Sequence, residues 1–149
     1  MQSRSGSGSR QAPSLDRTRF ADSLAPTGWH IALLRVDRDS RVLDVACGSG
    51  GPSLALVERT GCRLTGADVE AAAIAHAVAR AAARGLTGRA TFTVLDCGER
   101  LPFADEGFDS LLCVDAIHHL RDRFRTLSEW ARLLRPGGRL LFTDPSPIT

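Results

Sequence analysis

From residue 41 onwards the hydrophobic positions follow two alternating patterns. Short runs rich in Leu and β-branched residues are apolar at almost every position, as in strands that a parallel sheet buries on both faces. Between these runs, apolar residues recur at the spacing of one helix face. We therefore expect five strands separated by helices, with the strands at Arg41–Ala46, Arg63–Ala67, Ala90–Leu95, Ser110–Val114 and Arg139–Thr143.

Proline, glycine and acidic residues mark the expected ends of the helices. The first helix opens at Pro52, where the missing N–H costs nothing. The second runs from about Glu70 to Arg84 and ends at Gly85. The last begins near Asp122, a suitable N-cap, and ends near Leu134, before Pro136-Gly137-Gly138 turns the chain into the fifth strand.

The helical spacing also predicts which side chains face the core. A further short helix is expected before the first strand, from about Arg19 to Leu34, where it either forms part of a lid or packs over the sheet edge. The expected buried faces are Ala71, Ile74, Ala75, Val78 and Ala81 in the second helix, and Phe124, Leu127, Ala131 and Leu134 in the last.

Strands that alternate with helices predict an α/β fold with a doubly wound, mostly parallel sheet. Right-handed crossovers favour the strand order 3-2-1-4-5. In such sheets a ligand binds at the carboxyl ends of the strands, where the winding reverses between the first and fourth strands. The loops after Ala46, Ala67 and Val114 are therefore the candidate site.

Composition indicates an ordinary soluble domain. Residues 1–19 are mostly Ser, Gly, Gln and Arg, too polar to offset the entropy of ordering, and are expected to be disordered. Residues 20–149 have the length of one domain. A net charge of +2 favours neither a nucleic-acid partner nor a membrane surface. No apolar run suits a membrane span or signal peptide, so a cytoplasmic location is expected.

The four cysteines are expected to be free thiols. They lie far apart and form no CxxC pair, and no His stands at ligand spacing from them. Neither a disulfide framework nor a metal site is therefore expected from Cys47, Cys62, Cys97 and Cys113.

A glycine loop follows the first expected strand and precedes the first helix. Gly48 and Gly50 allow a tight turn and a close approach of backbone to ligand, and the helix start favours an anionic group. A glycine turn without a ligand is the alternative interpretation. Ser53 stands where a dinucleotide-binding loop has its third glycine, which argues against a nicotinamide cofactor and an oxidoreductase.

Two acids follow the next two strands. Asp68 is expected to accept hydrogen bonds from ribose hydroxyls, although an acid at this position also suits the start of the following helix. Asp96 ends the third strand and faces the same crevice, where it suits an adenine amino group; Asp is also common in turns.

Three segments in order resemble the class I, Rossmann-like S-adenosylmethionine-dependent methyltransferases. Val42–Gly50 is similar to their first motif. Leu101–Phe103, with Phe108-Asp109 after it, is similar to the segment before their fourth strand. Leu133–Gly138 is similar to their turn into the fifth strand. The resemblance covers residues 41–144, and it is greatest for the small-molecule branch that includes natural-product and ubiquinone-type methyltransferases.

The resemblance implies S-adenosylmethionine as cofactor and a role for each matched residue. Asp44 and the loop backbone would hold its methionine end, and Val69 would pack on the adenine. The N–H of Cys97 would assist Asp96, and Val114 would line the sulfonium region. Ala46 stands where the family commonly has Gly, with little expected effect on binding. The implied cofactor-binding residues are Asp44, Ala46, Gly48, Gly50, Asp68, Val69, Asp96, Cys97 and Val114.

A base for the acceptor is expected beyond the fourth and fifth strands. His118 and His119 follow the fourth strand, and Asp144 follows the fifth. An imidazole oriented by a carboxylate suits deprotonation of a hydroxyl, and the resembled branch uses such groups. His119 with Asp144 is the preferred pair; packing and cofactor contacts are the alternative for both histidines.

Family members usually have two further antiparallel strands after the fifth, which this chain is expected to lack, so the fifth strand is expected to be an exposed edge. Either a second copy or a partner covers this edge, or the chain is a truncated form of a longer protein. Two functions remain open besides the oxidoreductase. One is transfer of a methyl group to a small-molecule acceptor, with a hydroxyl favoured. The other is a non-catalytic, cofactor-binding module that needs a partner chain.

Overall fold

Five parallel strands form one sheet in the order β3-β2-β1-β4-β5, as the alternating pattern predicts. A computed structural model describes residues 28–143, so the expected disordered segment 1–19 and the start of the first helix lie outside the described residues. The strands are β1 (Arg41–Val45), β2 (Arg63–Asp68), β3 (Ala90–Val94), β4 (Phe108–Cys113) and β5 (Leu134–Phe142).

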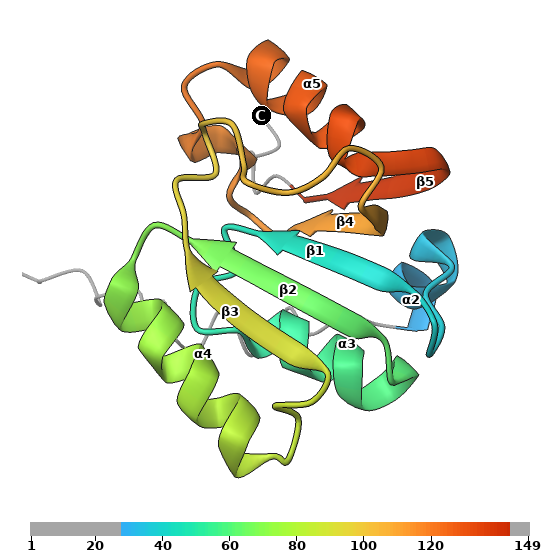
Figure 1. The fold of residues 1–149 in the computed structure, drawn as a ribbon, viewed down its shortest axis with the longest axis vertical. Helices are drawn as coiled ribbons and strands as arrows, with labels where there is room; N and C mark the ends of the chain where they lie inside the picture. The colour runs from blue at the N-terminus through green and yellow to red at the C-terminus, as the bar shows by residue number, and fades with distance from the viewer. Residues whose placement is uncertain (1–27, 144–149) are drawn as a thin grey trace, which may run out of the picture.

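Helices cover both faces of the sheet (Figure 1). They connect the strands except at one place: residues 95–107 join β3 to β4 without a helix, so the expected alternation of strands and helices is wrong there. They are α2 (Gly28–Leu34), α3 (Gly51–Thr60), α4 (Ala71–Ala83) and α5 (Arg123–Leu133), with the 3₁₀ helix η1 (Ile117–His119) after β4. Pro52 lies in the first turn of α3, and the Asp122 side chain caps α5 by accepting a hydrogen bond from the Arg125 N–H. Both helix starts are as expected.

Alternate residues of β1 enter two separate cores. Leu43 and Val45 pack with Trp130 and Leu133 of α5 on one face. Val42 packs on the other face, with side chains of α2 and α3 such as Leu34 and Leu54. Because β1 is central and buried on both sides, its carboxyl end is fixed between β2 and β4.

The buried stripe expected for α5 is only partly right. Phe124 is 84% exposed and Ala131 is exposed, whereas Thr126, Trp130 and Leu133 are buried. The two sets lie on neighbouring faces of the helix, and the face with the larger apolar side chain, Trp130, packs on the sheet. Leu127 and Leu134 are partly buried against the same core.

The face expected for α4 is only partly right. Ile74 and Ala81 are buried, and Ala77 joins them in place of Ala71, Ala75 and Val78, which are exposed. Alanines occur on every side of this helix, so their spacing does not distinguish one face from another.

Strand β5 begins earlier than expected because Pro136-Gly137-Gly138 forms an irregularity within the strand. Phe108 pairs with Leu134 but Ser110 pairs with Arg139, so the register shifts between these two pairs. The expected turn, residues 136–138, lies at this shift. Gly137 has a left-handed φ of +76°, and a Cβ on Gly138 would lie 2.8 Å from the Arg135 carbonyl. Glycine is required at both positions.

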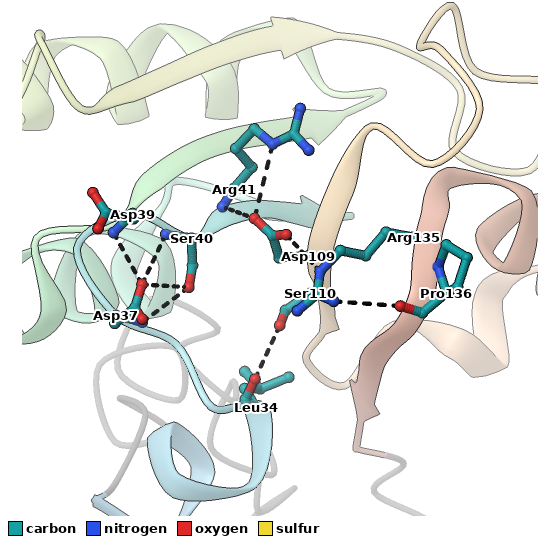
Figure 2. A network of polar contacts seen from close by, with 9 residues as sticks. All are labelled: Leu34, Asp37, Asp39, Ser40, Arg41, Asp109, Ser110, Arg135 and Pro136. Atoms are coloured by element: carbon teal, nitrogen blue, oxygen red, sulfur yellow. Dashed lines mark hydrogen bonds and ion pairs between the residues drawn. The ribbon is translucent and has the colours of Figure 1, made fainter.

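Asp109 joins the amino ends of three strands, as Figure 2 shows. Its Oδ2 accepts a hydrogen bond from the Arg41 N–H at 2.7 Å, and its Oδ1 accepts one from Arg135 Nε at 2.6 Å. Nearby, Ser110 Oγ donates to the Leu34 carbonyl and ties α2 to β4. This polar network lies at the amino ends and leaves the carboxyl ends to the candidate site. None of the helices within residues 28–143 is long and apolar enough to cross a membrane.

Candidate functional site

The glycine loop after β1 is held in a conformation that few side chains tolerate. Ala46, Gly48 and Gly50 have φ values of +55°, +56° and +79°. A Cβ on Gly48 would meet no atom within 4 Å, whereas one on Gly50 would lie 3.1 Å from Ala77 and Phe92. Gly48 therefore faces open space and Gly50 faces the protein. Ala46, for which little effect was expected, occupies a backbone region that disfavours Ala by roughly 1–2 kcal/mol.

Asp68 fixes the middle of this loop. It is the last residue of β2 and is 9% exposed. Its Oδ2 accepts a hydrogen bond from the Gly48 N–H at 2.8 Å, and its Oδ1 accepts one from the Glu70 N–H at 2.9 Å. The acid thus lies against the glycine loop and binds the backbone at the N-cap of α4, which is the helix-start role considered for it; its contact with a ribose stays a prediction. Each carboxylate oxygen keeps a further lone pair for a ligand.

Asp44 lies beneath the loop and is 2% exposed. It pairs with Gly66 of β2 and Leu112 of β4, in the centre of the sheet. Its Oδ2 accepts a hydrogen bond from Ser53 Oγ of α3. The pKa of Asp44 is raised to about 7: burial is the main cause, the Ser53 hydrogen bond opposes the rise, and the negative charge of Asp68 adds to it.

Phe92 of β3 supports the loop from below. A Cβ on Gly66 would lie 2.5 Å from the Phe92 ring and 2.9 Å from Cys47 Sγ. The same ring would lie 3.1 Å from a Cβ on Gly50. Two glycines, one in the loop and one in β2, therefore make room for one aromatic ring. Phe92 was not among the site residues predicted from the sequence.

The ends of β2 and β3 present an apolar surface beside Asp68. Val69 is 61% exposed and Val94 is 48% exposed, although both are apolar. Asp96 is exposed, and its Oδ1 accepts a hydrogen bond from the Gly98 N–H at 2.9 Å, which is the turn role considered for it. Cys97 is buried, with its Sγ 3.5 Å from the Ala67 carbonyl oxygen.

Three thiols lie near the site and are poor nucleophiles. Burial is the main cause that raises the pKa of Cys97 to about 11 and that of Cys113 to about 12, and it raises the pKa of Cys47 further. Asp44 adds to all three shifts through its negative charge. These cysteines are free thiols, as expected, and remain protonated at neutral pH.

At the end of β4, Val114 is partly buried against the core and Asp115 has a left-handed φ of +53°. Asp115 Oδ1 accepts a hydrogen bond from Thr143 Oγ1 at 2.6 Å, and its N–H lies 2.9 Å from the same hydroxyl oxygen. A non-Gly residue with positive φ at a strand end is a common mark of a functional position. The sequence analysis missed both residues, although the position of Asp115 in the third candidate loop was a usable signal.

Of the three residues expected to act as the base, only His119 is described together with its side chain. His119 is exposed and lies in η1, directly after the end of β4. The side chain of His118 and the whole of Asp144 lie outside the described part of the structure. Among the side chains of residues 31–143, leaving out that of His118, no group of three His, Cys, Asp or Glu residues is placed to hold a metal ion.

Ser53 is a further site residue that sequence reasoning missed. Its place in the glycine pattern was noticed as a departure from the dinucleotide loop, but its bond to Asp44 was not foreseen. The sequence did contain a signal for this bond: the hydroxyl of Ser53 follows the acid Asp44 by nine positions, with the glycine loop between them.

Known proteins are similar to this chain in sequence. Residues 42–138 match a family described as a methyltransferase domain. The chain is 39% identical over 111 residues to methyltransferase GfsG of Streptomyces halstedii, covering 74% of this chain and 40% of that protein. It is 33% identical over 134 residues to the 27-O-demethylrifamycin SV methyltransferase of Amycolatopsis mediterranei, covering 87% of this chain and 47% of that protein. The chain thus spans less than half the length of these two relatives.

The fold is also similar to that of a solved structure. The YcgJ protein of Bacillus subtilis superposes with a TM-score of 0.73 at 28% identity, covering 85% of this chain and 50% of that one. The family match includes the glycine loop, Asp44, Asp68 and the turn into β5. The chain therefore belongs to the methyltransferase domain family, within the Rossmann-like, S-adenosylmethionine-dependent class that its motifs resemble.

Proposed function

We propose that this chain is the cofactor-binding core of an S-adenosylmethionine-dependent methyltransferase that acts on a small-molecule acceptor. One observation carries the proposal. At the carboxyl ends of β1 and β2, a loop open at Gly48 lies between two buried acids, Asp44 and Asp68.

The residues present fit this cofactor. Asp68 has lone pairs for two ribose hydroxyls, and the exposed apolar surface of Val69 suits an adenine ring. Asp96 and the Cys97 N–H would contact the adenine edge. Asp44, with Ala46, Gly48 and Gly50 of the loop, would hold the charged amino-acid end, and Val114 would line the region of the sulfur.

The cofactor supplies a methyl group already activated by a sulfonium. What remains for the protein is to align the acceptor atom and exclude water, which is worth roughly 7–11 kcal/mol of the barrier. For a hydroxyl acceptor, His119 would take the proton as it leaves, with Asp144 to orient the imidazole and His118 beside it. The similarity to an O-demethylrifamycin methyltransferase supports a hydroxyl acceptor. A base of this kind contributes about 10²–10⁴-fold.

Titration of the purified chain with S-adenosylhomocysteine tests the proposal. We expect one saturable site, weakened tenfold or more by Asp68→Ala, because a hydrogen bond to a charged group contributes about 1.5–3 kcal/mol. Asp39→Ala, an exposed acid at the opposite end of the sheet, is the matched control and leaves binding unchanged. Saturable binding of NADH in place of the nucleoside thioether, or an unaffected Asp68→Ala, would contradict the assignment.

A second candidate is a cofactor-binding module that acts only with a partner chain or a second copy. The observation in its favour is the edge of β5: within the described residues this strand pairs with β4 alone, and Phe142 is 45% exposed. Measuring the mass of the chain in solution, and methyl transfer with and without added full-length relative, distinguishes the two functions.

A further inference from the structure

Ser53 closes the glycine loop from the side of α3. The residue lies in the first turn of the helix and is fully buried, with 0% of its surface exposed. Its Oγ donates a hydrogen bond to Oδ2 of Asp44. Asp44 lies nine residues earlier in the sequence, and Gly48 and Gly50 lie between the two residues. One side-chain hydrogen bond therefore joins the two ends of the loop, while Asp68 binds its middle through the Gly48 N–H.

Asp44 is a buried acid that the described protein residues leave without a cation. No ion pair within residues 28–143 involves it. The ionisable groups that influence it or feel its charge are Asp68 from β2 and the thiols of Cys47, Cys97 and Cys113. Each of these groups is either negative or neutral. Burial of a carboxylate in such surroundings is costly unless a ligand brings the opposite charge.

Asp44 also lies close to its point of titration at neutral pH. Its pKa is raised to about 7, mainly by burial, and the hydrogen bond from Ser53 is the one interaction among the described residues that opposes this rise. A hydroxyl that donates to a carboxylate favours the charged form. Without it the acid would be mostly neutral at pH 7 and would no longer attract a cation.

We propose that Ser53 is a positioning residue of the cofactor site: its hydroxyl fixes the Asp44 carboxyl beneath the glycine loop so that this group receives the cationic amino-acid end of the cofactor. The inference rests on the proposed function and adds to it the residue that makes the site selective for a positively charged ligand. Ser53 acts through Asp44 and does not itself contact the cofactor.

The test compares two ligands that differ only in the amino-acid end. S-adenosylhomocysteine carries the α-ammonium group, whereas 5′-methylthioadenosine shares the nucleoside thioether and lacks that group. Binding of each to the full chain is measured by calorimetry between pH 6 and pH 8.5. For Ser53→Ala we expect binding of S-adenosylhomocysteine to weaken tenfold or more at pH 7 and to recover toward pH 8.5, with binding of methylthioadenosine unchanged.

Two variants separate this role from simple structural support. Ser53→Thr keeps the hydroxyl and restores most of the affinity. Ser110→Ala removes a buried hydroxyl that bonds the Leu34 carbonyl at the other end of the sheet, and it leaves both ligands unaffected. Where Ser53→Ala does not fold, Ser53→Cys, a weak donor of similar size, takes its place.

The outcomes distinguish the inference from the proposed function. Loss of both ligands to the same extent in Ser53→Ala, or no change in the pH dependence, would overturn the role of Ser53 while wild-type binding still supports the methyltransferase. Failure of the wild-type chain to bind S-adenosylhomocysteine would instead reject the proposed function.

Discussion

Thr143 and Asp115 bind each other through both side chain and backbone at the carboxyl ends of β5 and β4. Thr143 Oγ1 donates to Asp115 Oδ1 at 2.6 Å, and the Asp115 N–H lies 2.9 Å from that hydroxyl and 3.2 Å from the Thr143 carbonyl oxygen. The pair holds Asp115 at a φ of +53° immediately before η1, which carries His119. It therefore orders the strand ends at which the acceptor base is proposed.

Thr143→Val is expected to lower the free energy of unfolding by about 1–2 kcal/mol, because the partly buried Asp115 loses its hydroxyl partner. Urea unfolding at pH 7 measures the change. Thr91→Val, an exposed position on the edge strand β3, is the control and should change stability by less than about 0.5 kcal/mol. Equal effects of the two substitutions would show that the Asp115 contact contributes nothing to stability.

Asp44→Asn is expected to stabilise the ligand-free chain at pH 8 and to remove binding of S-adenosylhomocysteine. The pKa of Asp44 is raised from an ordinary value of 3.8 to about 7. The folded chain thus holds a proton that the unfolded chain releases between these values, and wild-type stability falls as pH rises through this window. Asn does not titrate, so the variant avoids this loss. Its free energy of unfolding should exceed that of wild type by about 2–4 kcal/mol at pH 8.

Urea unfolding of wild type and Asp44→Asn at pH 4, 6 and 8 checks the sign. The advantage of the variant should be smallest at pH 4 and should level off above pH 7. An advantage that shrinks as pH rises would mean that Asp44 is stabilised in its charged form and that the protein supplies it with a cation.

Gly66→Ala is expected to cost about 1–3 kcal/mol, because its Cβ would lie 2.5 Å from the Phe92 ring in a well-packed region. Gly88→Ala is the matched control, since a Cβ there meets nothing within 4 Å. Combining Gly66→Ala with Phe92→Leu should recover part of the loss, as expected for residues in contact. Thermal unfolding of wild type, Gly66→Ala, Phe92→Leu and the double variant measures this coupling, and strict additivity would rule out the ring as the cause.

Arg132→Met is expected to cost about 2–3 kcal/mol. The guanidinium binds Glu129 and Asp105 and donates to the carbonyls of Leu101 and Phe103. Its loss would leave these acceptors without their partner. Arg125→Met removes an exposed pair with Glu99, in which both side chains are 61% exposed, and should cost at most about 1 kcal/mol.

The effect of Arg132→Met should also depend on pH. The hydrogen bond from Arg132 is the main cause that lowers the pKa of Glu129 below its ordinary value of 4.5. This stabilisation is present above pH 4.5 and is lost as pH falls through the lowered pKa. The gap between wild type and variant should therefore narrow in acid unfolding experiments, and the part that persists at pH 2 reflects the hydrogen bonds to the Leu101 and Phe103 carbonyls and packing of the arginine stem. A gap that does not narrow would show that the ion pair with Glu129 contributes nothing to stability.

The strand order and the place of the site were accessible from the sequence for a clear physical reason. Strands buried on both faces must be apolar throughout, and right-handed crossovers leave few orders for five of them. Asp68 and Gly48, which are 20 positions apart, were placed in neighbouring loops by this topology alone and do form a hydrogen bond. Membership of the methyltransferase family was likewise confirmed.

The buried faces of the helices and the side-chain hydrogen bonds between particular residues could not be predicted from the sequence in the same way. The spacing in α5 fits two neighbouring faces, and the packing of Trp130 on the sheet selects between them. The bonds of Ser53 to Asp44 and of Thr143 to Asp115 join residues whose side chains have many other partners in principle. The roles of His118, His119 and Asp144 stay predictions.

Ala46 adds strain at the start of the glycine loop. A glycine adopts a φ of +55° freely, whereas an alanine at this φ costs roughly 1–2 kcal/mol, so the surrounding contacts must hold the loop in place. This strain is offset during folding, before a ligand arrives. In a loop that keeps its conformation, the cost of Ala46 therefore falls on the stability of the folded chain and not on the free energy of ligand binding.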